Sequence, residues 1–102
     1  MKCEEIKSGT PKMSRKEVRK HLKSMGKWEL KGKMLVKYYK FRNFLQAMKF
    51  VNKIARLAER EQHHPDILIF SWNNVKISTY THSIDGLSLN DFILAAKINK
   101  IN

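Results

Sequence analysis

Residues 44–81 read FLQAMKFVNKIARLAEREQHHPDILIFSWNNVKISTYT, and this stretch predicts a helix, a junction and a hairpin. Apolar residues recur at helical spacing in its first part: Phe44, Met48, Val51, Ala55 and Ala58, with Ala47, Ile54 and Leu57 widening the stripe. The opposite face is polar and mostly basic: Arg42, Gln46, Lys49, Lys53, Arg56 and Arg60. The helix should end near Gln62, because Pro65 disfavours helical angles at His64.

The hairpin follows this helix. Its strands are expected near residues 67–72 and 75–81, joined through Asn73 and Asn74. Val75 and Ile77 should face the helices, and side chains alternate between the two faces along a strand. The same alternation carried forward places His82 on the helix-free face, outside the packed core.

A second hairpin and two further helices are predicted outside this stretch. Ser14 and Glu17 form a capping-box pattern that opens a helix, with Gly26 as its stop. Strands at residues 28–30 and 34–41 flank Lys31-Gly32-Lys33, and a last helix begins at Ser88. The order α-β-β-α-β-β-α predicts a single α+β domain at residues 13–102, with a four-stranded antiparallel sheet and helices on one face. Residues 1–12 are expected to be a polar, poorly ordered lead-in.

Length and composition limit the classes of protein to which the chain belongs. A chain of 102 residues with 42% hydrophobic content suits one modest core. The single cysteine, Cys3, excludes an intrachain disulfide and suits a reducing compartment. No apolar stretch resembles a secretory signal or spans a bilayer, so we expect a cytoplasmic protein that makes no use of a membrane.

Positive charge is concentrated in the first part of the chain. The formal net charge is +12, and residues 1–60 hold 18 Lys and Arg against 5 acidic residues. Such a half attracts nucleic acid, acidic lipid or an anionic protein, or it is simply a solvated lysine-rich surface. The basic face of the long helix has no interleaved aromatic residues, so nucleic-acid binding is the weaker interpretation.

Three of the four histidines, His63, His64 and His82, fall in or beside the second predicted hairpin. Imidazoles titrate near neutral pH, so two of them can protonate a leaving group and remove a neighbouring proton. Glu59 lies one helical turn before His63 and is predicted to orient that ring, and Asp91 is predicted to orient another histidine.

Each of these residues also has a structural interpretation. Adjacent histidines before a proline are often ordinary surface residues, Glu59 suits a solvated helix, and Asp91 suits a helix N-terminus. Three histidines can also bind zinc. Two neighbouring rings that diverge are poorly placed for one ion, however, and we predict no metal site.

The spacing of these residues resembles a family pattern. Glu59, three intervening residues, His63-His64-Pro65, then Trp72, His82 and Asp91 is similar to the motif of the pterin-4a-carbinolamine dehydratases. The similarity extends to three further segments, at residues 28–30, 39–44 and 86–88, and spans about residues 13–98.

The resemblance implies an enzyme that expels water from a 4a-hydroxytetrahydropterin and yields quinonoid dihydropterin, in support of tetrahydrobiopterin recycling. It implies that His63 and His82 are the acid–base pair, that His64 orients the pterin and that Glu59 and Asp91 support the histidines. Which histidine is the acid is left open. Trp28 and Trp72 are weaker candidates for the pocket, with core packing as their alternative. No cofactor is implied, since the pterin is the substrate.

The resemblance also implies an assembly, either a homodimer formed by joining sheet edges or a homotetramer formed through helices. Some animal members of the family bind a homeodomain transcription factor. A non-catalytic dimerisation partner is therefore the alternative function, and only family analogy supports it.

Overall fold

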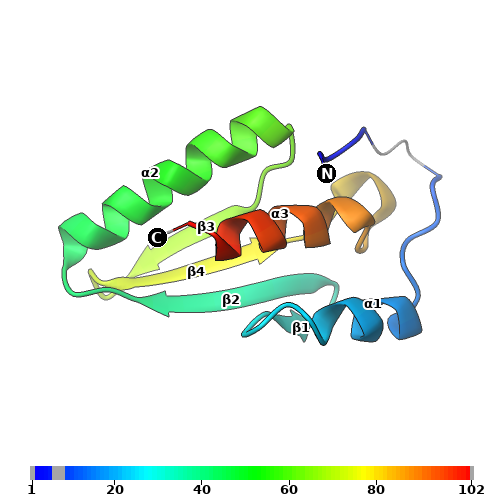
Figure 1. Cartoon of the computed structure of the whole chain (residues 1–102), viewed down its shortest axis with the longest axis horizontal. Helices are drawn as coiled ribbons and strands as arrows, with labels where there is room; N and C mark the ends of the chain where they lie inside the picture. Colours follow the sequence, from blue (N-terminus) through cyan, green and yellow to red (C-terminus); the bar gives the residue numbers. More distant parts are fainter. Residues whose placement is uncertain (1, 6–8, 102) are drawn as a thin grey trace.

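The computed structural model describes residues 2–5 and 9–101. The elements follow one another as α1 (Arg15–Leu22), β1 (Glu29–Lys31), β2 (Met34–Lys40), α2 (Phe44–Glu61), β3 (Asp66–Phe70), β4 (Asn74–Thr79), the short 3-10 helix η1 (His82–Ile84) and α3 (Leu89–Asn99) (Figure 1). This order confirms the predicted α+β class.

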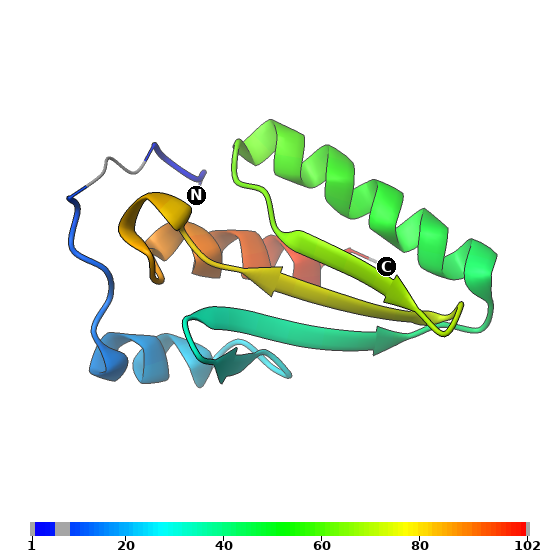
Figure 2. The same ribbon diagram turned by 180° about the vertical axis from the view of Figure 1, so that it is seen from behind.

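The four strands form one antiparallel sheet in the order β1-β2-β4-β3. The two central strands, β2 and β4, pair from Leu35 with Thr79 to Lys40 with Asn74. Helices α2 and α3 lie on one face of this sheet, and the view from behind shows the other face without a helix (Figure 2). The predicted layering is therefore confirmed.

Both hairpins turn through left-handed residues. In the first, Lys31 pairs with Met34 across a two-residue loop that contains Gly32 at φ 60°. In the second, β3 ends at Phe70, and Ser71 and Trp72 both have positive φ. The predicted strand over residues 67–72 thus ran two residues past the end of β3, and Trp72 is an exposed turn residue.

The core lies between the helix-bearing face of the sheet and the two long helices. Leu35, Val75 and Ile77 from the sheet have no exposed area, and neither do Ile54 of α2 and Leu94 of α3. Trp28 packs at the edge of this core, where its Nε1–H donates to Asn99 Oδ1 at 2.9 Å. Core packing is therefore the correct interpretation of Trp28.

The side of α2 that is buried against the sheet differs in part from the predicted one. The buried apolar face consists of Ala47, Phe50, Ile54, Leu57 and Ala58. Phe44 and Ala55, which the periodicity placed on the buried stripe, are exposed. The apolar arc of this helix is wider than the sheet can cover, and periodicity alone does not say which side of the arc is covered.

The first helix begins as predicted, with the capping box between Ser14 and Glu17. It ends at Leu22, four residues before Gly26, because the amides of Ser24 and Met25 bond three residues back in tighter turns. In the lead-in, Met1 and residues 6–8 lie outside the described residues. Cys3 and Glu4, by contrast, make hydrogen bonds to α2 and α3, contrary to the expectation of poor order.

Two leucines on helices provide a matched test of this core. Leu94 has 0% exposure and Leu45 has 63% exposure. Leu94→Ala should lower the free energy of unfolding by about 2–5 kcal/mol, because it leaves a cavity between α3 and the sheet. Leu45→Ala should change it by less than about 0.5 kcal/mol. Urea unfolding of both variants tests the packing, and equal losses would contradict it.

Candidate active site

His63 occupies the exit from α2. The helix ends with Gln62 in a left-handed conformation at φ 56°, and His63 bonds back to the carbonyl of Ala58. The ring of His63 points towards α3, where its Nε2 lies 2.7 Å from Asp91 Oδ1. The His63 side chain is 11% exposed and that of Asp91 is 0% exposed. The two side chains form a pair that is shielded from water.

Asp91 has three further hydrogen-bond donors. Thr79 Oγ1 donates to its Oδ1 at 2.7 Å, Thr81 Oγ1 donates to its Oδ2 at 2.8 Å, and the amide of Ser88 donates to Oδ2 at 3.0 Å. Each carboxylate oxygen therefore accepts two bonds, which is the arrangement of an ionised carboxylate. The sequence did not predict either threonine contact, because a threonine near the end of a strand carries no signal of its own.

His64 points away from this buried pair. Pro65 holds the chain extended after it, and its ring Nε2 hydrogen-bonds the carboxylate of Glu59. Both side chains are exposed. The prediction that Glu59 orients His63 was thus wrong, because the left-handed Gln62 ends the helical spacing before His63. Asp91 orients His63 instead, and Glu59 orients His64.

His82 lies beyond the end of β4. The strand stops at Thr79, and His82 begins η1, so strand alternation does not extend to this residue. The prediction that His82 lies outside the core is nevertheless confirmed, since the residue is exposed. Its ring packs against Tyr80 with the ring centroids 4.1 Å apart. Tyr80 thus limits the directions in which the imidazole can turn.

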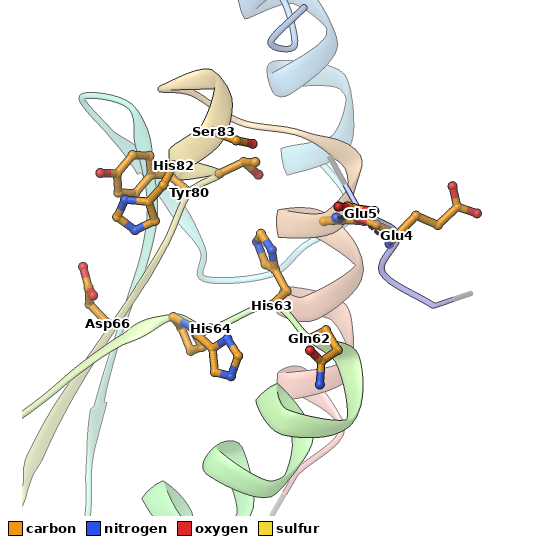
Figure 3. Close-up of a pocket in the computed structure, with 12 residues that line it drawn as sticks. Glu4, Glu5, Gln62, His63, His64, Asp66, Tyr80, His82 and Ser83 are labelled. Carbon is orange, nitrogen blue, oxygen red and sulfur yellow. Dashed lines mark hydrogen bonds between the residues drawn. The ribbon is translucent and has the colours of Figure 1, made fainter. Parts of the chain in front are cut away.

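One cavity of about 420 Å³ brings the three histidines together. Its lining comes from four parts of the chain: Glu4, Glu5, Gln62, His63, His64, Pro65, Asp66, Tyr80, Thr81, His82, Ser83 and Asn90. In Figure 3, His82 and Tyr80 lie on one side, with His63 and His64 across from them. Neither Trp28 nor Trp72 is among the residues that line this cavity.

No group of three or more His, Cys, Asp or Glu side chains in residues 2–5 and 9–101 is arranged to hold a metal ion. Within the same ranges, no helix combines the length and the apolar character that crossing a membrane requires.

Known proteins are similar to this chain in sequence and in fold. The family model described as pterin 4 alpha carbinolamine dehydratase matches residues 11–101. Two relatives carry the name "Putative pterin-4-alpha-carbinolamine dehydratase". The one from Alkaliphilus metalliredigens is 43% identical over 97% of this chain and 90% of its own length. The one from Rickettsia bellii is 46% identical over 96% of this chain and 88% of its own length.

Two solved structures extend the comparison. A protein described as a transcriptional coactivator/pterin dehydratase from Brucella melitensis superposes with a TM-score of 0.81 and 27% identity, over 87% of this chain and 96% of that one. A pterin dehydratase-like protein described as a RuBisCO assembly factor in the alpha-carboxysome gives a TM-score of 0.57 and 26% identity, over 71% of this chain and 82% of that one. With the family model covering nearly the whole chain, this protein belongs to the pterin 4 alpha carbinolamine dehydratase family.

Proposed function

We propose that this protein is a dehydratase that converts a 4a-hydroxytetrahydropterin into quinonoid dihydropterin and water. An acid donates a proton to the 4a-hydroxyl oxygen, and the C4a–O bond breaks to release water. A base removes the proton from N5, and the N5–C4a double bond forms. The meeting of His63, His64 and His82 at one cavity carries this proposal, because the reaction needs a proton donor and a proton acceptor around one ring.

His63 is the base in this proposal. Its Nε2 faces a carboxylate that already accepts three other donors, so the N–H of the neutral ring lies on Nε2. The remaining ring nitrogen, Nδ1, then carries a lone pair that can accept the N5 proton. Asp91 stabilises the imidazolium that results, and it holds the ring in one orientation.

His82 is the acid. It comes from η1, on the other side of the cavity from His63, and no carboxylate hydrogen-bonds its ring in the described part of the chain (Figure 3). Protons therefore exchange between this exposed ring and water after each turnover, which restores the acid. Tyr80 keeps the imidazole over the cavity through the contact between their rings.

His64 binds and orients the pterin, and Glu59 supports His64. The carboxylate of Glu59 bonds one ring nitrogen of His64, so the other ring nitrogen is the one that can meet a pterin at the cavity wall. The proposed reaction eliminates water by proton transfer and involves no net oxidation or reduction, so it needs neither a metal nor a redox cofactor, and its product suits tetrahydrobiopterin recycling.

Partner binding is the second candidate function. β3 is an edge strand, and its exposed side chains Leu68 and Phe70 lie close to the exposed Trp72. Exposed apolar residues on an edge strand favour pairing with another chain, including a second copy of this one. A protein whose only role is binding would not depend on the three histidines.

Replacing either proposed catalytic histidine should abolish most of the activity. His63→Ala and His82→Ala should each lower kcat/KM by roughly 10²- to 10⁴-fold, because each removes one proton-transfer group. The rate is followed by absorbance on substrate generated in situ by an aromatic hydroxylase, with subtraction of spontaneous dehydration. His21→Ala is the matched control, since His21 packs against Phe92 outside the cavity. Full activity in both catalytic variants would favour the binding role.

Asp91→Asn tests the assignment of His63 as the base. The substitution keeps the size of the side chain, but its amide group can donate to Nε2 and reverse the tautomer. We expect kcat to fall by roughly 10²-fold or more with the fold retained. Asp85→Asn is the matched control, because Asp85 is exposed, pairs with Lys33 and does not line the cavity. An Asp91→Asn variant as active as the Asp85→Asn variant would refute the assignment.

A further inference from the structure

Residues 3–5 form a short segment, here called the N-terminal strap, that docks against the ends of two helices. The amide of Cys3 donates to Glu61 Oε1 at 2.9 Å, and its Sγ donates to the carbonyl of Asn90 at 3.4 Å. The amide of Glu4 donates to Asn90 Oδ1 at 2.9 Å, and Asn90 Nδ2 donates to the carbonyl of Glu4. Both ribbon views show this segment beside the end of α2 and the start of α3 (Figures 1 and 2).

The side chains that hold the strap are buried. Glu61 is 6% exposed and Asn90 is 5% exposed. Lys97 Nζ lies 2.7 Å from Glu61 Oε2, and this bond, followed by the one from Cys3, lowers the pKa of Glu61. The amide group of Asn90 bonds the strap through both its oxygen and its nitrogen, so departure of the strap breaks both bonds and exposes these atoms to water.

The strap contacts lie next to the pair formed by His63 and Asp91. Asn90 directly precedes Asp91 in α3, and Glu61 lies two residues before His63 at the end of α2. The strap thus bridges the two elements whose separation sets the bond between His63 and Asp91. Glu4 and Glu5 also line the cavity that holds the three histidines (Figure 3).

We propose that the N-terminal strap is part of the active site. It forms one wall of the pterin cavity and holds His63 and Asp91 at hydrogen-bonding distance. Asn90 and Glu61 are then positioning residues that act through the strap. Occupation of the cavity by a pterin and docking of the strap strengthen each other, since linkage between two binding events is reciprocal. This inference rests on the proposed function.

Cys3 provides a readout of strap docking that does not depend on activity. It is the only cysteine, so a thiol reagent reports on this position alone. Burial and the nearby Glu61 raise the pKa of Cys3 to about 11 from the model-compound value of 9.0. Since only the thiolate reacts, release of the strap should speed labelling at pH 8 by up to about 100-fold.

The experiment labels Cys3 with dithiobis(nitrobenzoate) in the full chain, with and without saturating 7,8-dihydrobiopterin. Asn90→Ala removes the side chain that holds the strap. Glu4→Pro leaves both helices intact and removes the amide donor on the strap together with the Glu4 carboxylate. Its effect is therefore read relative to Glu4→Ala, which loses the same carboxylate and keeps the amide. Asn90→Ala relative to the wild type, and Glu4→Pro relative to Glu4→Ala, should each label at least 10-fold faster and lose at least 10-fold in kcat/KM. Asn52→Ala, on an exposed part of α2, and Lys2→Pro are the matched controls and should do neither.

The dihydropterin should slow labelling of the wild type several-fold and have no such effect in Asn90→Ala. Binding of the dihydropterin is measured separately by fluorescence. If it binds and labelling is unchanged, or if Glu4→Pro keeps full activity while labelling rapidly, the strap inference is overturned. If the dihydropterin binds and protects Cys3 while the wild type does not accelerate dehydration, the proposed reaction is wrong and the strap remains part of the cavity.

Discussion

The site depends on the hydrogen bonds that surround the buried carboxylate of Asp91. A charge without exposed area is tolerated only when donors surround it, and here they come from Thr79, Thr81, Ser88 and His63. These donors belong to the end of β4, the start of α3 and the exit from α2. The bonds that permit burial of the charge therefore also join the three elements, and they fix the orientation of the imidazole of His63, the proposed base.

The two neighbouring histidines illustrate how a fold divides roles between identical side chains. His63 turns inwards to a buried aspartate, while Pro65 keeps His64 extended and its ring meets an exposed glutamate. A pair with little access to water holds one tautomer and one direction, whereas an exposed pair adjusts to a ligand. The first environment suits a base that must face one atom of the substrate. The second suits a residue that helps to seat the ring.

The order of the elements was predictable from the sequence, because periodicity, caps and turn residues act locally. The three histidines were predicted from their spacing and the family resemblance, and the structure brings them to one cavity. The covered side of α2 was not predictable, since its apolar arc runs from Phe44 round to Phe50 and only the sheet decides which part is buried. The pairing of Glu59 was mistaken for a similar reason. One left-handed residue, Gln62, redirects the chain, so helical spacing does not predict which side chains are neighbours beyond it.

The contacts that sequence reasoning missed are those made between distant residues. The strap meets Asn90 across more than 80 positions, and Thr79 and Thr81 reach Asp91 only once β4 and α3 have packed. No local pattern marks such contacts, because a polar residue near a terminus or a strand end is ordinary in isolation. In the folded structure, the burial of the polar groups identifies these contacts. Asn90 and Glu61 each remove a polar group from water, and a fold keeps such groups inside only where they have partners. Those partners, and not the histidines alone, define how far the site extends.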